Sequence, residues 1–218
     1  EIQDVEVKEP VMSKLLYIQA SPRQERSYAI RLANSFAETY SKTHPGDEIL
    51  TMPLFEKELP AFDGLAVRAK YTIMHGQEHT SEELSAWKAV EAVIQEFKAA
   101  DKYLLAAPMW NFGIPYRLKQ YLDILVQPGY TFSFSPEEGY KGLIIGKPLC
   151  IAYSRGGEYP YDSPMDFQKK YLETIFGFIG FTNIQSVIVE PTLAGGPETA
   201  QKKLIEAMRK AQAIAEVF

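Results

Sequence analysis

The 218-residue sequence contains a single cysteine, Cys150, and only three histidines. One cysteine cannot form a disulfide within the chain, and so low a content is typical of proteins from a reducing compartment. Cys150 lies inside an apolar run, where a small buried residue is the ordinary interpretation. We therefore predict neither an internal disulfide nor a redox-active thiol.

The chain also lacks a cluster of lysine and arginine residues, and its formal net charge is −5. A mildly acidic chain without a basic patch is not expected to bind nucleic acid or an anionic membrane surface. No apolar run approaches the roughly 18 residues that a membrane-spanning helix needs, and no signal-peptide pattern opens the sequence. We therefore predict no nucleic-acid partner, no membrane partner and a cytoplasmic location.

Patterns for metal or triad chemistry are equally scarce. The run His75-Gly-Gln-Glu78-His79 has the spacing of an inverted zinc-peptidase motif, but Gly76 interrupts it in the weakest helical stretch of the chain. His44 is the only other histidine, so a third imidazole ligand is hard to supply. We predict a solvated loop there and no metal site, and we find no nucleophile-base pair for hydrolysis.

The length and the 46% hydrophobic content suit one domain with a full core. Residues 1–11 are charged and unpatterned and precede Met12-Ser13-Lys14. We expect residues 1–11 to be a disordered extension or a remnant of cloning, and residues 12–218 to form a single domain.

Short apolar runs of strand length alternate with helical periodicity along the whole chain. The strands are expected at 14–20, 47–53, 103–107, 147–153 and 183–190, and the main helices at 28–43, 81–99, 115–125, 167–178 and 196–217. Ser27 and Ser81 are predicted helix caps, and 130–142 a small hairpin. Such alternation predicts an α/β three-layer sandwich with a five-stranded parallel sheet of order 2-1-3-4-5, the flavodoxin-like topology.

The segment from Tyr103 to Phe134 is the most informative part of the chain. An apolar strand ends on Pro108, the loop Met109-Trp-Asn-Phe-Gly113 follows, and Pro115 opens a helix. In an open parallel sheet, ligands bind beyond the carboxyl ends of the strands. This loop therefore predicts a site wall with two large aromatic side chains and one amide.

Two other loops, after the strands at 14–20 and 147–153, lie at the same edge of the predicted sheet. The first carries Ser21, Arg23, Arg26 and Ser27 beside a helix start, which suits one phosphate group. For this loop taken alone, Ser27 as a mere cap with solvated arginines is the more common explanation, and it is the combination with the other loops that favours a ligand site. No Walker or G-x-G-x-x-G spacing follows the first strand. The other loop contains Gly156-Gly157, where backbone can approach a ring closely. A monophosphate site beside a flat slot favours flavin mononucleotide (FMN).

The motifs A-P-M-W-N-F-G-I-P, G-Y-T-F-S-F and S-R-G-G strongly resemble those of the FMN-dependent NADH-azoreductases, over essentially residues 12–218. The resemblance implies contacts to FMN from three loops, here Ser21, Arg23, Ser27 and Tyr28, then Pro108, Met109, Trp110, Asn111 and Phe112, then Ser154, Arg155, Gly156 and Gly157. The family often has tyrosine at the position of Trp110.

The resemblance also implies an activity and a partner. NADH or NADPH gives a hydride to the flavin, which reduces an azo compound or a quinone, with no catalytic protein acid or nucleophile. The family works as a homodimer with the active site at the interface, so Asn111, Phe112, Phe134 and Phe178 are expected to contact substrate. An electron carrier without its own nicotinamide site is the alternative, and a flavin-free phosphodiesterase is a more distant one.

Overall fold

The computed structural model describes residues 12–218, so the prediction for residues 1–11 lies outside the described part of the chain. Five parallel strands form the central sheet: β1 (Lys14–Gln19), β2 (Glu48–Pro53), β3 (Lys102–Pro108), β6 (Pro148–Ser154) and β7 (Asn183–Val189). Their order is β2-β1-β3-β6-β7, which confirms the predicted flavodoxin-like order. The order reverses between β1 and β3, so a crevice is expected beyond their carboxyl ends.

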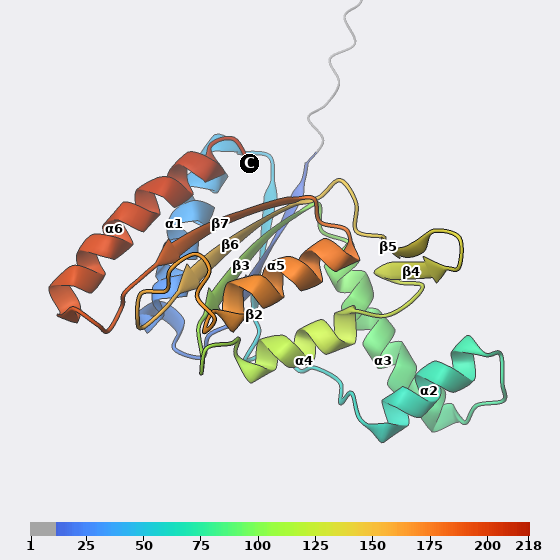
Figure 1. The fold of residues 1–218 in the computed structure, drawn as a ribbon. Coiled ribbons are helices and arrows are strands. Elements are labelled where there is room, and N and C mark those ends of the chain that lie inside the picture. Colours follow the sequence, from blue (N-terminus) through green and yellow to red (C-terminus); the bar gives the residue numbers. More distant parts are fainter. Residues whose placement is uncertain (1–11) are drawn as a thin grey trace, which may run out of the picture.

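Helices cover both faces of this sheet (Figure 1). One face carries α1 (Tyr28–Thr43) and α6 (Gly196–Ala215), and the other carries α3 (Ser81–Lys98), α4 (Tyr116–Leu125) and α5 (Phe167–Ile179). The short helix α2 (Gly64–Met74) packs on α3 at the periphery. A 3-10 turn, η1 (Gln24–Arg26), precedes α1.

Alternating side chains of the strands build two separate cores, because successive residues of a strand point to opposite faces. In β3, Leu105 packs with α3, α4 and α5, whereas Leu104 packs with α1 and α6. Both side chains are fully buried. In β6, Cys150 belongs to the α1/α6 core and is 2% exposed, and burial raises the pKa of its thiol to about 12. The buried position matches the expectation of an ordinary core residue.

Two local predictions need comment. Ser27 caps α1 as expected, with its hydroxyl accepting from the Ile30 amide at 3.5 Å. The predicted cap Ser81 is wrong, because Thr80 is the cap of α3 and Ser81 is its first residue. Thr80 and Glu83 form a reciprocal capping box, which Ser81 cannot form because Leu84 lies three residues further on.

The predicted hairpin consists of β4 (Phe132–Ser135) and β5 (Gly139–Gly142), paired antiparallel. It lies beside the carboxyl end of α5 (Figure 1), where a Cβ on Gly142 would lie 2.3 Å from the Gly180 amide nitrogen. The hairpin therefore joins the domain through a backbone-to-backbone contact that only glycine permits at this position.

Candidate active site

A cavity of about 360 Å³ opens at the carboxyl edge of the sheet, where the loops after four strands meet. It is lined by residues from the loops after β1, β3, β6 and β7: Ser21, Arg23, Ser27, Tyr28, Pro108, Met109, Trp110, Ser154, Gly156, Thr192, Leu193, Gly196 and Pro197. The edge is therefore the one at which ligands of open parallel sheets bind.

The loop after β1 supplies the polar end of the cavity. The hydroxyl-bearing residues Ser21 and Ser27 are 5% and 2% exposed, and Arg23 is the only charged side chain among the described lining residues. Ser27 is the N-cap of α1, whose first amides have no partner within the helix and carry the positive end of its dipole. Two hydroxyls, one cation and a helix start make a binding site for an anion.

The loop after β3 is a two-residue turn. The amide and carbonyl of Trp110 exchange hydrogen bonds with those of Gly113 at 3.1 and 2.9 Å, and the two intervening residues have positive φ angles, 48° at Asn111 and 68° at Phe112. Trp110 faces the cavity and also contacts Phe55, with ring centroids 5.8 Å apart. This turn holds the main chain of Asn111 and Phe112 at the rim.

The loop after β6 is fixed by its neighbours. The Ser154 carbonyl accepts from the Met109 amide at 2.8 Å, and the Gly156 carbonyl accepts from the Leu193 and Ala194 amides at 3.0 Å each. A Cβ on Gly156 would lie 3.0 Å from the Leu193 side chain. Gly156 therefore lets main chain and Leu193 close this side of the cavity together.

The loop after β7 was not predicted as part of the site. It contributes Thr192, Leu193, Gly196 and Pro197, and Leu193 is 76% exposed although it is apolar. The signal available in the sequence was positional, because β7 is parallel to the other strands and its carboxyl end reaches the same edge.

Several predicted residues lie elsewhere. Asn111 lines a neighbouring, more open groove together with Phe62 and with Tyr116, the first residue of α4. Phe112 lies outside the cavity and is 42% exposed. Gly157 does not line the cavity, and the Arg155 side chain is 2% exposed among carboxylates. The structure thus brings together the predicted residues of the first loop, Pro108 to Trp110, Ser154 and Gly156.

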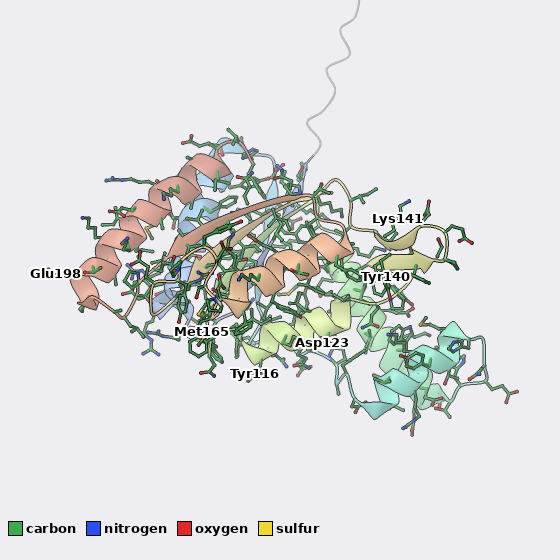
Figure 2. All side chains as sticks on the ribbon, in the orientation of Figure 1. Tyr116, Asp123, Tyr140, Lys141, Met165 and Glu198 are labelled. Carbon is green, nitrogen blue, oxygen red and sulfur yellow. The ribbon has the colours of Figure 1, made fainter. Side chains whose placement is uncertain are left out.

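The predicted substrate residues of the hairpin region are also outside the cavity. Phe134 is 61% exposed and packs on Tyr140, and Phe178 packs on Phe132 with ring centroids 4.8 Å apart. In Figure 2, Tyr140 lies beside the carboxyl end of α5. Met165, just before α5, and Glu198, in the first turn of α6, lie on the opposite side of the view. Within one chain, these two phenylalanines do not reach the cavity.

The histidine motif forms no site. His75 is the residue that ends α2, and His75 and His79 each pair through Nδ1 with a nearby backbone carbonyl. Within residues 12–218, no group of three histidine, cysteine, aspartate or glutamate side chains is arranged to hold a metal ion.

Among the helices of this described part, none combines the length and the apolar composition that a membrane span needs.

The lining residues fit a flavin mononucleotide. The volume lies in the range of small-ligand pockets, and the polar end offers hydroxyl, cationic and amide donors for one phosphate. The rest of the lining combines the apolar side chains of Met109, Trp110 and Leu193 with the polar ones of Ser154 and Thr192, as a ring system with hydrogen-bonding edges requires. Glycine at position 156 leaves room beside Leu193, which a Cβ would approach to 3.0 Å.

Comparison with known proteins gives consistent results. A family model described as the flavodoxin-like fold matches residues 13–215. The FMN-dependent NADH:quinone oxidoreductase of Nitratidesulfovibrio vulgaris (strain Hildenborough) is 51% identical over 210 residues, covering 95% of this chain and 100% of that protein. Among solved structures, an azoreductase from Bacillus anthracis str. Sterne has a TM-score of 0.87 at 30% identity, covering 95% of this chain and 100% of its own. An FMN-dependent NADH-azoreductase from Bacillus anthracis str. Ames Ancestor, in complex with FMN, has a TM-score of 0.81 at 28% identity, covering 94% and 100%.

Proposed function

Because the chain belongs to the flavodoxin-like family of FMN-dependent NADH:quinone oxidoreductases, we propose that it binds FMN in the cavity at the carboxyl edge of the sheet and uses NADH to reduce quinones and azo compounds. The observation that carries the proposal is that one cavity is lined both by the hydroxyl and guanidinium groups of the loop after β1 and by the large apolar side chains of Met109 and Trp110. NADPH is the second candidate reductant. The expected cytoplasmic location stays a prediction.

The chain's own residues hold the phosphate. Ser21 and Ser27 donate hydroxyl hydrogen bonds, Arg23 supplies the positive charge, and the first amides of α1 complete the cradle. Charge-assisted hydrogen bonds of this kind are roughly twice as strong as neutral ones. Most of the affinity for FMN over riboflavin therefore resides in this loop.

Lining residues from the loops after β3 and β6 would orient the ring. Met109 and Trp110 would pack against it, and the main chain at Gly156 would supply an amide to it. When bound, FMN would supply two-electron redox chemistry between the nicotinamide and the oxidant. The protein contributes binding, orientation and exclusion of water, and this division of labour requires no catalytic acid or nucleophile.

We also propose a homodimer in which the partner completes each site. Exposed apolar residues flank the cavity, among them Tyr116 at 67% and Phe167 at 61% exposure, and a groove of about 450 Å³ between α4 and α5 includes Ile114 and Tyr171. Figure 2 shows Tyr116 and Met165 along this edge. Phe134 and Phe178, which lie outside the cavity of their own chain, are then candidates to cover the partner's flavin.

Steady-state turnover tests the function. The purified protein with added FMN is expected to oxidise NADH continuously when a soluble quinone or azo dye is the only acceptor. An electron carrier of the same fold would need a partner reductase, so the absence of turnover despite bound FMN would favour that alternative. For the dimer, Phe134→Ala is expected to raise the KM for the acceptor severalfold while the phosphate-binding loop and FMN affinity stay intact.

A further inference from the structure

We propose that Arg155 is a positioning residue that fixes the wall of the FMN site, rather than a ligand of the cofactor. The inference rests on the proposed function, because it concerns how this cavity is shaped for a flavin. It corrects the sequence-based prediction, which assigned Arg155 to cofactor binding together with its neighbours Ser154 and Gly156.

The guanidinium group of Arg155 is fully engaged by protein groups. Its Nη2 lies 2.7 Å from Oδ2 of Asp166, its Nη1 lies 3.4 Å from Oε2 of Glu190, and its Nε donates to Oε1 of Gln168 at 3.0 Å. The side chain is 2% exposed, and the residue does not line the cavity. All three guanidinium nitrogens are thus bonded to protein groups, and a buried side chain outside the cavity lining is not placed to make a bidentate phosphate contact there.

Each partner of Arg155 anchors a different element of the site. Gln168, which is fully buried on α5, donates through Nε2 to the Ala107 carbonyl at 2.9 Å, next to Pro108 at the end of β3. Asp166 accepts from the Lys169 amide at 2.9 Å and so caps α5. Glu190, directly after β7, also accepts from the Tyr159 amide at 3.2 Å. One cation thereby ties β3, β6, β7 and α5 together.

The main chain of Arg155 extends this link to the cavity wall. Its amide donates to the Val189 carbonyl at 3.0 Å, and its carbonyl accepts from the Thr192 amide and hydroxyl at 2.8 and 2.9 Å. Thr192, Leu193, Ser154 and Gly156 all line the cavity. The residues on either side of Arg155 in sequence, and Thr192, which is bonded to its carbonyl, are therefore part of the wall.

Lysine cannot reproduce this arrangement, because an ammonium group has no planar fork to reach three acceptors that lie apart. Removing the charge altogether leaves Asp166, whose side chain is 4% exposed, buried without its counter-ion. Either change is expected to loosen the wall while Ser21, Arg23 and Ser27 stay in place, because these phosphate-binding residues lie on the loop after β1.

Titration of the apoprotein with FMN and with riboflavin, followed by flavin fluorescence, separates a positioning residue from a ligand. Riboflavin lacks the phosphate. A positioning Arg155 predicts that Arg155→Lys weakens both flavins by the same factor, about tenfold, and alters the visible circular dichroism of bound FMN. The matched control Arg23→Gln is expected to weaken FMN about tenfold and riboflavin hardly at all.

Two results would overturn the inference. If Arg155→Lys lowers FMN affinity but spares riboflavin, Arg155 binds the phosphate directly. If both affinities and the dichroism are unchanged while only the melting temperature falls, its role is confined to stability. If Arg155→Lys does not fold, Gln168→Met repeats the test, because it removes the link to Ala107 without changing the charge. This variant is expected to weaken the binding of FMN and of riboflavin by the same factor, about threefold. A wild-type protein that binds neither flavin would instead refute the proposed function itself, and the inference with it.

Discussion

Trp110 and Gly113 exchange two backbone hydrogen bonds, and the turn that they close holds Asn111 and Phe112 with left-handed backbone angles. Among the described residues, Gln24 is the only other non-glycine residue with a positive φ, and it lies in the loop after β1. Left-handed conformations of residues with side chains are unfavourable and gather at functional sites. Both loops that carry them border the proposed flavin site.

Asn111 tests the cost of this turn. Asparagine tolerates a left-handed conformation, glycine adopts it freely, and alanine does so at a cost of roughly 1–2 kcal/mol. Asn111→Ala is therefore expected to be less stable than Asn111→Gly by about 1 kcal/mol in urea unfolding at equilibrium. Equal stabilities for the two variants would contradict the left-handed turn.

Gly156 and Leu193 form a second testable pair. A methyl group at position 156 would meet Leu193 at 3.0 Å, so that Gly156→Ala requires this exposed side chain, which lines the cavity, to shift. We expect Gly156→Ala to weaken FMN binding about tenfold, equivalent to about 1.4 kcal/mol.

Adding Leu193→Ala should recover most of that loss, because the two residues share one space and their effects are then not additive. Independent effects in a double-mutant cycle of FMN dissociation constants would show that the contact does not shape the site.

The junction between the hairpin and α5 predicts opposite effects for two glycines. Alanine at position 142 would overlap the backbone at Gly180, with atoms 2.3 Å apart, so Gly142→Ala is expected to destabilise the protein by about 3 kcal/mol. Gly177, exposed on α5 with open space around its Cβ position, should gain about 0.5–1 kcal/mol when replaced by alanine. Thermal unfolding of both variants checks the signs, and a harmless Gly142→Ala would show that the hairpin does not pack here.

The surroundings of Asp47 predict that the free energy of unfolding depends on pH in the acid range. Burial alone would raise the pKa of its carboxyl, but hydrogen bonds from the Tyr40 hydroxyl and the Ser13 amide, together with the Lys102 ammonium at 3.5 Å, hold the pKa below its usual value of 3.8. A lowered folded-state pKa stabilises the fold above the unfolded value, and this contribution is lost as pH falls through the folded value.

The difference in unfolding free energy between wild type and Asp47→Asn should therefore be constant above about pH 5 and shrink below about pH 4. Urea unfolding at a series of pH values measures it. Glu137→Gln, at an exposed position in the hairpin turn, is the matched control, and a difference for Asp47→Asn that does not change with pH would contradict the assignment.

The sequence was sufficient for the sheet order and for much of the cavity, because strand length, helical period and turn residues are local signals. Ser27 and Pro108 were placed correctly on this basis. The cap of α3 was missed although Thr80 and Glu83 carry the capping-box spacing. The positioning role that we propose for Arg155 could not be recognised for a different reason, since its carboxylate partners lie 11 and 35 residues away and only the fold brings them together. The loop at Thr192 and Leu193 has no chemical motif and is identified only by its position after β7.

The central claim is that this cavity holds FMN and passes electrons from NADH to a small acceptor. An anaerobic visible spectrum of the protein reconstituted with FMN and freed of excess cofactor tests it most directly. We predict oxidised-flavin bands that bleach when NADH is added and return when a quinone is added. A protein that retains no flavin after gel filtration, or a bound flavin that NADH leaves oxidised, would contradict the account.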